Sequence, residues 1–520
     1  MDDLIPRRSG QARDTGPSGR RDLLALAFGL AAFVLHALVA GRYDVFRDEL
    51  YFIVCGRHPA LGYVDQPPVV PLLAAGLFAL GEHVWLLRLP LALAAGGLAW
   101  LAVRLARQMG GDGVAAALAG LCVTIAPMLM GMGATLNTTG FDPLLWTAIA
   151  ACLAQAVRTG DPRWLWPCGG LAGLDLEIKY ALVFWGVSLV VGMGLTDARR
   201  LLARKEAWGA LALAAVIAAP SLVWQARNGW PFLELAAAAR NKNTDVPIPA
   251  FLLNQVVVMN PLLAPVWVAG IAGPFVMARL RPYRFLSVAF VICAALVIAT
   301  HGKDYYLAAA YPVMFVLGAV TLGHALGRRE GRAILAVGSA AALTLSAILA
   351  PLALPVLPLP GLRAYVRALP MKPQQQERSF QGTALPQVFA DQLGWRDFTA
   401  QVRAAWAQVP VSERSRTGIK VDNYGEAAAL DVYGAKAGLP PALSGHNQYF
   451  LWGLRGQQPV NLLVVQDHPE RLAPYCRESR VLGLTSSPDA MAYENGKAIA
   501  LCLGLKVDLR TLWPELKSYN

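Results

Sequence analysis

The chain has 520 residues, of which 56% are hydrophobic and only 15% are charged. Soluble domains carry roughly a quarter charged residues, so this composition excludes an ordinary soluble protein and indicates a polytopic membrane protein. The formal net charge of +12 does not indicate nucleic-acid binding, because lysine and arginine cluster between apolar segments, which is the pattern of membrane topology.

The first 21 residues are polar and contain five arginines before the first apolar segment. A cleaved signal peptide is one interpretation of this arrangement. However, the residues before Gly41 read Leu-Val-Ala rather than Ala-x-Ala, and many apolar segments follow. We therefore expect a basic cytoplasmic tail over residues 1–21, followed by an uncleaved first helix.

Apolar segments of spanning length recur along the chain up to residue 360. A spanning helix needs about 20 mostly apolar residues, and on this scale we expect a transmembrane domain of eleven spans over residues 22–360. The stretch 68–80 is apolar but too short to span, so it predicts an interfacial helix. The expected spans are 22–40, 84–106, 113–132, 141–158, 163–176, 179–196, 207–225, 250–278, 284–301, 305–326 and 331–358.

The distribution of arginine orients these spans. If the N-terminus is cytoplasmic, the short arginine-rich turns all fall on the cytoplasmic side, as the positive-inside rule requires. The opposite orientation would break this rule at nearly every short loop. We therefore expect the first loop (41–83), the loop around Lys303 and the C-terminal region (361–520) to be extracytoplasmic.

Composition changes after a proline-rich stretch at 351–360, where the chain becomes more polar and turn-rich. Alternating and helical apolar patterns in this part predict a small α/β domain of about 150 residues. The expected helices are 395–408, 425–437 and a closing segment at 512–516, and the expected strands are 417–422, 461–466 and 498–504.

The C-terminal domain also carries two cysteines, Cys476 and Cys502. Because we expect this domain outside the cytoplasm, these two can form a disulfide. None of the seven cysteines falls in a Cys-x-x-Cys or Cys/His spacing, so the sequence predicts no metal cluster. The C-terminal domain can recognise an acceptor through polar side chains, or it can be purely structural. The candidate side chains are Asn423, Tyr424, His446 and Asn447.

The first loop is rich in charge that membrane anchoring does not need. Asp48 and Glu49 follow Arg47 directly, and a fixed carboxylate can take the proton of an alcohol that attacks an anomeric carbon. Arg47 or Arg57 can hold a phosphate leaving group. A solvated loop whose charges pair with one another is the alternative interpretation.

Other polar residues are expected on the same side of the membrane. Asp142 opens the fourth span, where it either caps the helix or takes part in a site. Lys179, beside Asp175, lies at a later turn, either in an ion pair or in a functional role. Lys303 and Tyr305, at the mouth of another span, can grip a lipid phosphate.

Four elements resemble glycosyltransferase family 39, the polyprenyl-phosphate-dependent, dolichyl-phosphate-mannose-protein mannosyltransferase-like enzymes of the GT-C class. The resemblance covers about residues 22–330, and the tail resembles that of a bacterial subgroup. The four elements are Arg47-Asp48-Glu49-Leu50-Tyr51, Gly62-Tyr63-Val64-Asp65-Gln66-Pro67-Pro68, Asp142-Pro143 and Lys179-Tyr180.

The resemblance implies a GT-C-type helical bundle in a bacterial inner membrane. Such an enzyme moves a sugar from a polyprenyl phosphate to a cell-envelope acceptor outside the cytoplasm. The expected reaction inverts the anomeric carbon and needs no obligatory metal. Asp48 matches the family's catalytic aspartate, and Glu49 is its expected supporting carboxylate. Gln66 stands where aminoarabinose transferases often carry lysine, which argues against that donor and leaves galacturonic acid, mannose or another hexose open. The expected substrate-binding residues are Arg47, Tyr51, Arg57, Tyr63, Asp65, Gln66, Asp142, Lys179, Lys303 and Tyr305.

Three other functions fit the same composition. A lipid-linked oligosaccharide ligase or polymerase also works outside the cytoplasm on lipid-linked sugars. A transporter is less favoured, because the sequence shows no pair of related halves and its polar residues collect at one face. A catalytically silent scaffold with a folded tail is the third. The acceptor, the prenyl length and the oligomeric state stay open.

Overall fold

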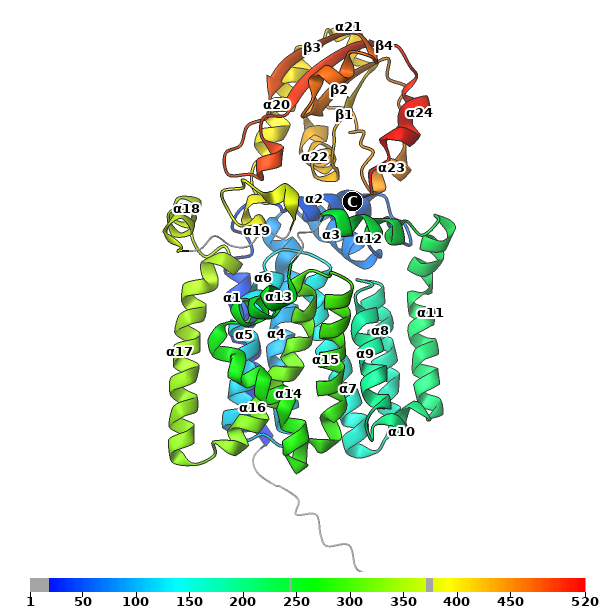
Figure 1. The fold of residues 1–520 in the computed structure, drawn as a ribbon. Coiled ribbons are helices and arrows are strands. Elements are labelled where there is room, and N and C mark those ends of the chain that lie inside the picture. The colour runs from blue at the N-terminus through cyan, green and yellow to red at the C-terminus, as the bar shows by residue number, and fades with distance from the viewer. Residues whose placement is uncertain (1–17, 243–245, 371–376, 520) are drawn as a thin grey trace, which may run out of the picture.

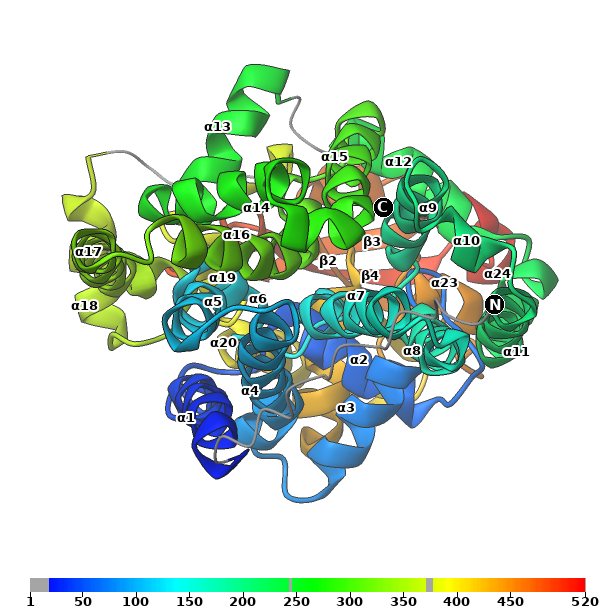
Figure 2. The ribbon, with the colours of Figure 1, turned by 90° about the horizontal axis from the view of Figure 1, so that it is seen from below.

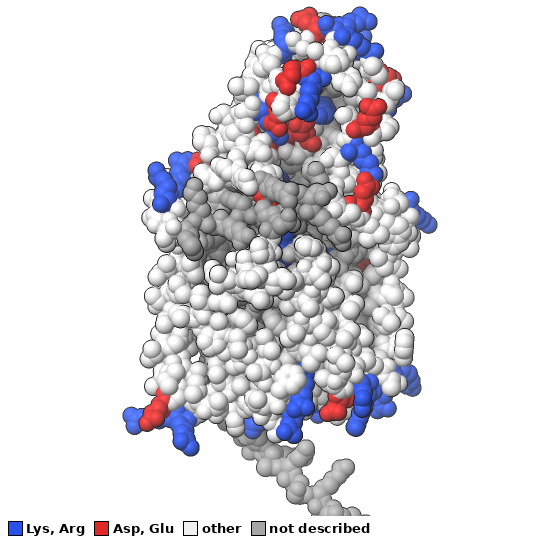
Figure 3. Space-filling view, viewed as in Figure 1, with Lys and Arg blue, Asp and Glu red and all other residues white. Residues whose placement is uncertain are grey.

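A bundle of long helices carries a small sheet domain on one end, with a layer of short helices between the two (Figure 1). The computed structural model describes residues 18–242, 246–370 and 377–519, so most of the predicted basic tail lies outside the described residues. Along the side of the bundle the described surface is nearly free of charge, and Lys and Arg gather at the end away from the sheet domain (Figure 3). An uncharged belt between charged ends is the surface that a membrane requires.

Six helices in the described part of the chain are long and apolar enough to span a membrane, or seven if one bent pair counts as a single span. The prediction of a polytopic helical membrane protein is confirmed, whereas the count of eleven spans is not. The bundle helices are α1 (Ser18–Ala37), α4 (Val84–Gln108), α5 (Gly113–Ile125), α6 (Pro127–Met132), α7 (Asp142–Thr159), α8 (Leu165–Leu176), α9 (Leu182–Gly194), α11 (Lys205–Arg227), α14 (Ala264–Val276), α15 (Arg284–Ala299), α16 (Tyr311–Ala325) and α17 (Arg329–Ala353).

Helix α16 lies in the middle of the bundle beside α14, as the view from below shows (Figure 2). Small residues allow this close approach: a Cβ atom on Gly318 of α16 would lie 1.7 Å from the carbonyl oxygen of Val266 in α14. Membrane helices associate through such small residues because lipid supplies no hydrophobic driving force between them.

The span predicted at 250–278 is not one continuous helix, because the chain bends by 91° between α13 (Ile248–Val258) and α14, as in a broken span or a re-entrant loop. Asn260 stands at the bend with a φ of 71°, and Pro261 after it cannot donate a helical hydrogen bond. The Asn260 side chain donates to Ser346 Oγ (2.7 Å) and Ala342 O (2.9 Å) of α17. A buried polar contact therefore ties the break to a neighbouring helix.

Three short helices lie across the end of the bundle that faces the sheet domain: α2 (Arg47–Arg57), α3 (Val69–Ala79) and α12 (Pro231–Lys242) (Figure 1). Helix α3 corresponds to the short apolar helix predicted at 68–80. Helix α2 was expected to be part of a loop. It forms because Glu49 accepts the backbone N–H of Phe46 (2.8 Å), which closes the first turn, and because its acidic residues stand at the helix N-terminus.

The C-terminal domain has a four-stranded sheet in the order β1-β2-β4-β3, in which β1 and β2 are parallel and the other pairs antiparallel. The predicted helix 425–437 is α-helical only up to Ala429. Strand β3 was missed because its first half carries consecutive polar residues and most of its residues are exposed at the sheet edge. The elements are α18 (Leu359–Ala368), α19 (Gln387–Ala390), α20 (Trp395–Ala407), β1 (Thr417–Lys420), α22 (Tyr424–Ala429), α23 (Gln448–Trp452), β2 (Asn461–Gln466), β3 (Cys476–Leu484), β4 (Ala498–Leu505) and α24 (Leu509–Leu512).

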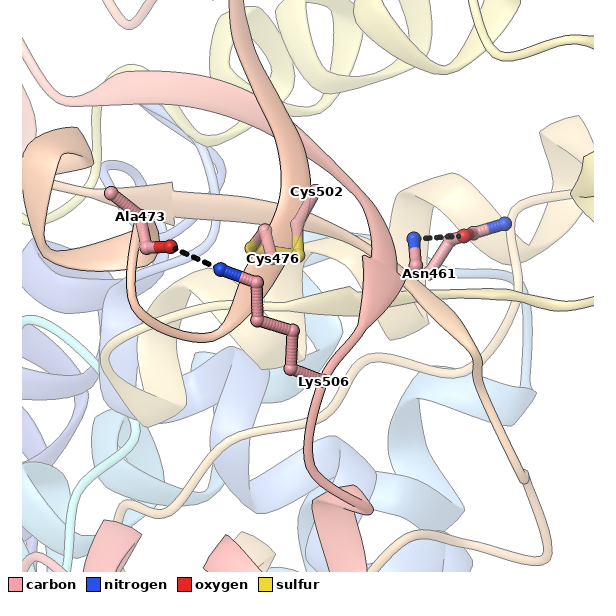
Figure 4. Close-up of a disulfide and its surroundings, with 6 residues drawn as sticks. Asn461, Ala473, Cys476, Cys502 and Lys506 are labelled. Carbon is pink, nitrogen blue, oxygen red and sulfur yellow. Dashed lines mark hydrogen bonds between the residues drawn. A yellow bond between two sulfur atoms is a disulfide. The ribbon is translucent and has the colours of Figure 1, made fainter.

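The predicted disulfide between Cys476 and Cys502 is present and joins β3 to β4 (Figure 4). Two further contacts secure this end of the sheet: Lys506 Nζ donates to the Ala473 carbonyl (3.1 Å), and Asn461 accepts from the Gly504 N–H (2.8 Å). Elsewhere, one continuous hydrophobic core joins α2 with α20 and α22. The seam between the bundle end and the C-terminal domain is therefore packed from both sides.

Candidate functional site

Asp48 stands in the first turn of α2, at the seam between the two parts of the molecule. Its Oδ1 accepts hydrogen bonds from Arg47 Nε (3.1 Å) and from the hydroxyl of Tyr424 (2.8 Å) in α22. Its side chain is 31% exposed. Among the residues that the structure describes, no donor is hydrogen-bonded to Oδ2. The carboxylate is thus held through one oxygen, and no described residue is hydrogen-bonded to the other.

Arg47 ties this end of α2 to the C-terminal domain. Its Nη1 donates to the hydroxyl of Tyr493 (2.6 Å) and lies 3.6 Å from the Asp391 carboxylate, while the Asp391 carbonyl accepts the Arg47 N–H. The guanidinium also lies 5.3 Å from the centre of the Tyr424 ring. The Arg47 side chain is thus engaged by protein groups on several sides.

Glu49 occupies a closed environment. It is fully buried, and both of its oxygens accept from Arg88, Oε1 from Nε (2.9 Å) and Oε2 from Nη2 (3.0 Å). The backbone N–H groups of Leu136 (2.7 Å) and Phe46 (2.8 Å) complete four hydrogen bonds. This placement favours a structural role and does not support the catalytic one predicted for Glu49.

Asp65 bridges the first loop and the C-terminal domain. Its Oδ1 accepts from Tyr51 OH (3.0 Å) and its Oδ2 from Asn447 Nδ2 (3.3 Å), and the Tyr51 oxygen in turn accepts the N–H of Gln448 (3.1 Å). Burial raises the pKa of Asp65 to about 7. Asp48 contributes to the same rise, which places the two carboxylates within electrostatic reach of each other.

Lys303 and Tyr305 approach from the loop that precedes α16. Lys303 Nζ donates to Glu377 Oε1 (2.7 Å) and lies 6.0 Å from the Tyr305 ring centre. Tyr305 meets Tyr306 edge to face, with ring centres 4.8 Å apart, and is close enough to Asp48 to feel its charge. These residues therefore belong to the surroundings of Asp48.

A pair of buried carboxylates, Asp142 and Asp175, lies where α7 begins and α8 ends. They interact with each other and with Lys179, while Asp142 Oδ1 and both Asp175 oxygens have no hydrogen-bond partner in the described part of the chain. Lys179 Nζ donates to Thr139 Oγ1 and lies 5.1 Å from the Tyr306 ring. Tyr306 thus connects Lys179 with Tyr305.

Three predicted substrate-binding residues have other surroundings. Arg57 is exposed at the far end of α2, about 14 Å from Asp48 at the helical rise of 1.5 Å per residue. The Tyr63 hydroxyl is buried and donates to the Cys55 carbonyl (2.8 Å). Gln66 is buried, and its carbonyl accepts the Tyr63 N–H, which closes a turn. Tyr63 and Gln66 shape the loop, and Arg57 does not reach Asp48.

The sequence missed Arg88, Asp391 and Tyr493, whose positions carry no local signal because their partners in α2 are distant in the chain. It did single out four polar residues of the tail. Tyr424 and Asn447 contact Asp48 and Asp65 directly, whereas Asn423 caps α22 and His446 accepts the Tyr424 N–H (3.2 Å). No group of three His, Cys, Asp or Glu side chains in the described residues is arranged to hold a metal ion, and the expectation that none is obligatory stays a prediction.

Two comparisons of the sequence point to mannosyltransferases. A family model described as dolichyl-phosphate-mannose-protein mannosyltransferase matches residues 65–224. The protein named "Putative mannosyltransferase YycA" of Bacillus subtilis (strain 168) is 33% identical over 158 residues, which are 30% of this chain and 22% of that protein. The chain therefore spans about a fifth of the length of this relative, and Asp48 lies before the stretch that the family model matches.

The fold is similar to solved structures over nearly the whole chain. ArnT from Cupriavidus metallidurans bound to undecaprenyl phosphate is 16% identical, with a TM-score of 0.54 and coverage of 94% of this chain and 98% of that one. The apo structure of the same protein has a TM-score of 0.53 at the same identity and coverage. The family model therefore supports the resemblance to glycosyltransferases over residues 65–224, and the ArnT structures show a similar fold over nearly the whole chain.

Proposed function

We propose that this chain is an integral-membrane glycosyltransferase that moves a sugar from a polyprenyl phosphate to an acceptor hydroxyl, with Asp48 as the general base. The observation that carries the proposal is the environment of Asp48, whose Oδ1 is fixed by two donors while Oδ2 is unpartnered in the described part of the chain. A base needs this combination of a fixed orientation and one available lone pair.

The chemical step is a single displacement at the anomeric carbon. The acceptor O–H gives its proton to Asp48 Oδ2 while the acceptor oxygen forms a bond to that carbon. The bond from the anomeric carbon to the phosphate oxygen breaks, and polyprenyl phosphate leaves with the electron pair. The configuration at the anomeric carbon inverts, and proximity of donor and acceptor in one site lowers the entropic part of the barrier.

Two lysines supply the positive charge that a phosphate leaving group requires. Lys179 and Lys303 lie against the Tyr306 and Tyr305 rings, and these rings contact each other, so the lysines flank one aromatic pair near Asp48. We propose that they contact the donor phosphate, and that Arg47 acts mainly by fixing Asp48. The proposed site also includes Tyr51, Asp65 and Asp142. Arg57 is no longer part of it.

The proposed face is the extracytoplasmic side of a bacterial inner membrane. Lys and Arg gather at the end of the bundle opposite the sheet domain (Figure 3), and by the positive-inside rule this supports a cytoplasmic location for that end. The disulfide in the sheet domain suits an oxidising compartment. The acceptor is then a glycan, lipid or protein of the cell envelope.

Deletion of the gene tests the function in the cell. We expect one prenyl-phosphate sugar to accumulate while one envelope glycan, lipid or protein loses a single sugar residue, both measured by mass spectrometry. Loss of a whole oligosaccharide instead would favour a ligase or polymerase. Movement of the lipid-linked sugar across proteoliposomes without transfer would favour a transporter.

Two isosteric variants test the base. Asp48→Asn should reduce transfer at least 100-fold, which is the lower end for removal of a general base. Asp44→Asn is the matched control, because Asp44 lies in the same loop and accepts from Tyr433 and Arg396 of the C-terminal domain without contacting Asp48. Near-normal transfer by Asp48→Asn would reject Asp48 as the base.

A further inference from the structure

We propose that Tyr424 of the C-terminal domain is a positioning residue for Asp48: its hydroxyl fixes Oδ1, so that Oδ2 is the oxygen that takes the acceptor proton. This inference rests on the proposed function and deepens it. It makes the C-terminal domain a part of the active site, although its residues lie far from Asp48 in the chain and beyond the stretch that the family model matches.

The geometry of Asp48 shows why its orientation depends on Tyr424. Two donors bind Oδ1. Arg47 Nε, of the preceding residue in the same helix, lies 3.1 Å away, and the Tyr424 hydroxyl, which belongs to the C-terminal domain, lies 2.8 Å away. With both donors on one oxygen, rotation of the carboxylate would cost two hydrogen bonds to a charged group. The result is one available oxygen in a defined position.

Tyr424 is itself held on several sides. Its ring lies 4.5 Å from the Tyr51 ring and 4.9 Å from the His446 ring, measured between centres, and the Arg47 guanidinium lies 5.3 Å away. The residue is 8% exposed. Burial raises the pKa of its hydroxyl well above the ordinary value, so it stays protonated and can only donate to Asp48.

The start of α22 fixes the backbone of Tyr424. The Asn423 side chain accepts the N–H of Glu426 (3.0 Å), and the Glu426 carboxylate accepts the N–H of Asn423 (3.1 Å), which is a capping box. Glu426 also forms a buried ion pair with Lys497 (2.6 Å), the residue before β4. The position of the Tyr424 hydroxyl is thus determined by the fold of the C-terminal domain.

The experiment uses the full-length protein and compares Tyr424→Phe with Tyr433→Phe. Tyr433 is a matched control, since its hydroxyl also reaches from the C-terminal domain to a carboxylate of the first loop, donating to Asp44 Oδ1 (3.1 Å). The readout is the transfer reaction, divided into kcat and KM, and the unfolding temperature of each variant checks that it has folded.

Without the Tyr424 hydroxyl, Arg47 Nε is the donor that remains on Oδ1 among the described residues, so the carboxylate is less firmly oriented toward the acceptor. We therefore expect Tyr424→Phe to lower kcat with little change in KM, and Tyr433→Phe to leave both unchanged. Equal kcat values in the two variants would overturn the proposal.

A fluorinated tyrosine at position 424 guards against a folding defect, because it keeps the shape of the side chain while its more acidic hydroxyl donates more strongly. We expect it to keep kcat at or above the wild-type value, in contrast to Tyr424→Phe. A kcat about 10-fold or more below wild type in this variant would contradict the proposal even if Tyr424→Phe did not fold.

Transfer activity separates this inference from the proposed function. With the lipid-linked sugar that accumulates in the deletion strain as donor, we expect Tyr424→Phe to lower kcat about 10- to 100-fold with little change in KM, the range for loss of a hydrogen bond to a charged group. If Asp48→Asn is inactive and Tyr424→Phe matches Tyr433→Phe, the positioning role fails alone. If Asp48→Asn stays active, the proposed base fails.

Discussion

Asp48 and Glu49 are neighbours in the chain, and their carboxylates lie in opposite environments. Glu49 is fully buried with four donors, whereas Asp48 is partly exposed and held through one oxygen. Successive residues of a helix point about 100° apart, so one side chain enters the bundle while the other reaches the seam below the C-terminal domain. The acidic pair therefore divides into a buried, ion-paired member and a partly exposed one, which is the proposed base.

Glu49→Gln and Arg88→Met should each lower the free energy of unfolding by about 3–5 kcal/mol, because each leaves a buried partner without its counter-charge. The unfolding temperature should fall accordingly. The double variant Glu49→Leu with Arg88→Met should recover only part of this loss. Arg88 also donates to the backbone carbonyls of Ala40, Arg42 and Asp44, and these would lose their donor.

Thermal unfolding of the purified protein in detergent measures this effect, with Asp48→Asn as the control. The control should keep the wild-type unfolding temperature while losing transfer. Glu49→Gln at the wild-type unfolding temperature would contradict a structural ion pair.

The same two residues show how far the sequence could predict this site. Apolar runs predicted most bundle helices because a spanning helix satisfies its backbone within one local segment. The acidic pair and the Asp142, Lys179 and Lys303 positions were also visible in the sequence. The division of roles was not, because Arg88 lies 39 residues after Glu49 and Tyr424 lies 376 residues after Asp48.

Errors in the fold have equally specific causes. The break at Asn260 depends on its contact with Ser346, and the apolar composition on both sides concealed it. Strand β3 lies mostly exposed at a sheet edge and begins with consecutive polar residues, so its apolar pattern was too weak to predict a strand. Long-range partners and edge positions are features that local periodicity does not record.

Asp65 should make stability depend on pH. Burial raises its pKa in the folded protein to about 7, above the value of 3.8 for an unperturbed aspartate, so between these values the folded state binds more protons than the unfolded state. Wild-type stability should therefore fall as pH rises from about 4 to 7 and then level off. Asp65→Asn lacks this loss and should be more stable than wild type at pH 8. We expect the difference in the free energy of unfolding to be on the order of 1 kcal/mol, because Asp65 is only partly buried.

The unfolding temperatures of wild type and Asp65→Asn, recorded from pH 4 to pH 8, give this difference. The two proteins should coincide at the acidic end and diverge toward pH 8. A constant difference across the range would show that Asp65 titrates in the folded protein as it does in the unfolded chain.

Asp142 and Asp175 predict an unusual response to an amide. Three of their four oxygens have no partner among the described residues, and the two side chains lie against each other. An amide at position 175 can donate to the Asp142 carboxylate. Asp175→Asn should therefore keep or raise the unfolding temperature, which corresponds to a gain of up to about 1 kcal/mol in the free energy of unfolding. Asp175→Ala is the control and should lower it, because it removes packing and supplies no donor. Equal losses in both variants would contradict this account of the pair.

The orientation in the membrane predicts which surface residues a reagent can reach. Lys436 of the C-terminal domain and Arg332 at the start of α17 are 66% and 56% exposed. Lys436 pairs with Glu82 of the first loop, at the end of the bundle that faces the sheet domain, whereas α17 begins at the opposite end of the bundle (Figure 1). In spheroplasts a membrane-impermeant maleimide should label Lys436→Cys and leave Arg332→Cys unlabelled until the membrane is opened. Labelling of Arg332→Cys alone would reverse the proposed topology.

The disulfide should stabilise the edge of the sheet that reaches Arg47. In the described part of the chain, β3 pairs with β4 alone. The Cys476–Cys502 bond joins residues 26 positions apart, which corresponds to about 3.5 kcal/mol in the chain-entropy model. Tyr493, which accepts from Arg47, lies in the connection between these two strands. Cys476→Ala with Cys502→Ala should therefore lower both the unfolding temperature of the C-terminal domain and the transfer rate. A reductant should reproduce both effects in wild type and have none on the double variant. Two free thiols in mass spectra of the unreduced protein would contradict this prediction.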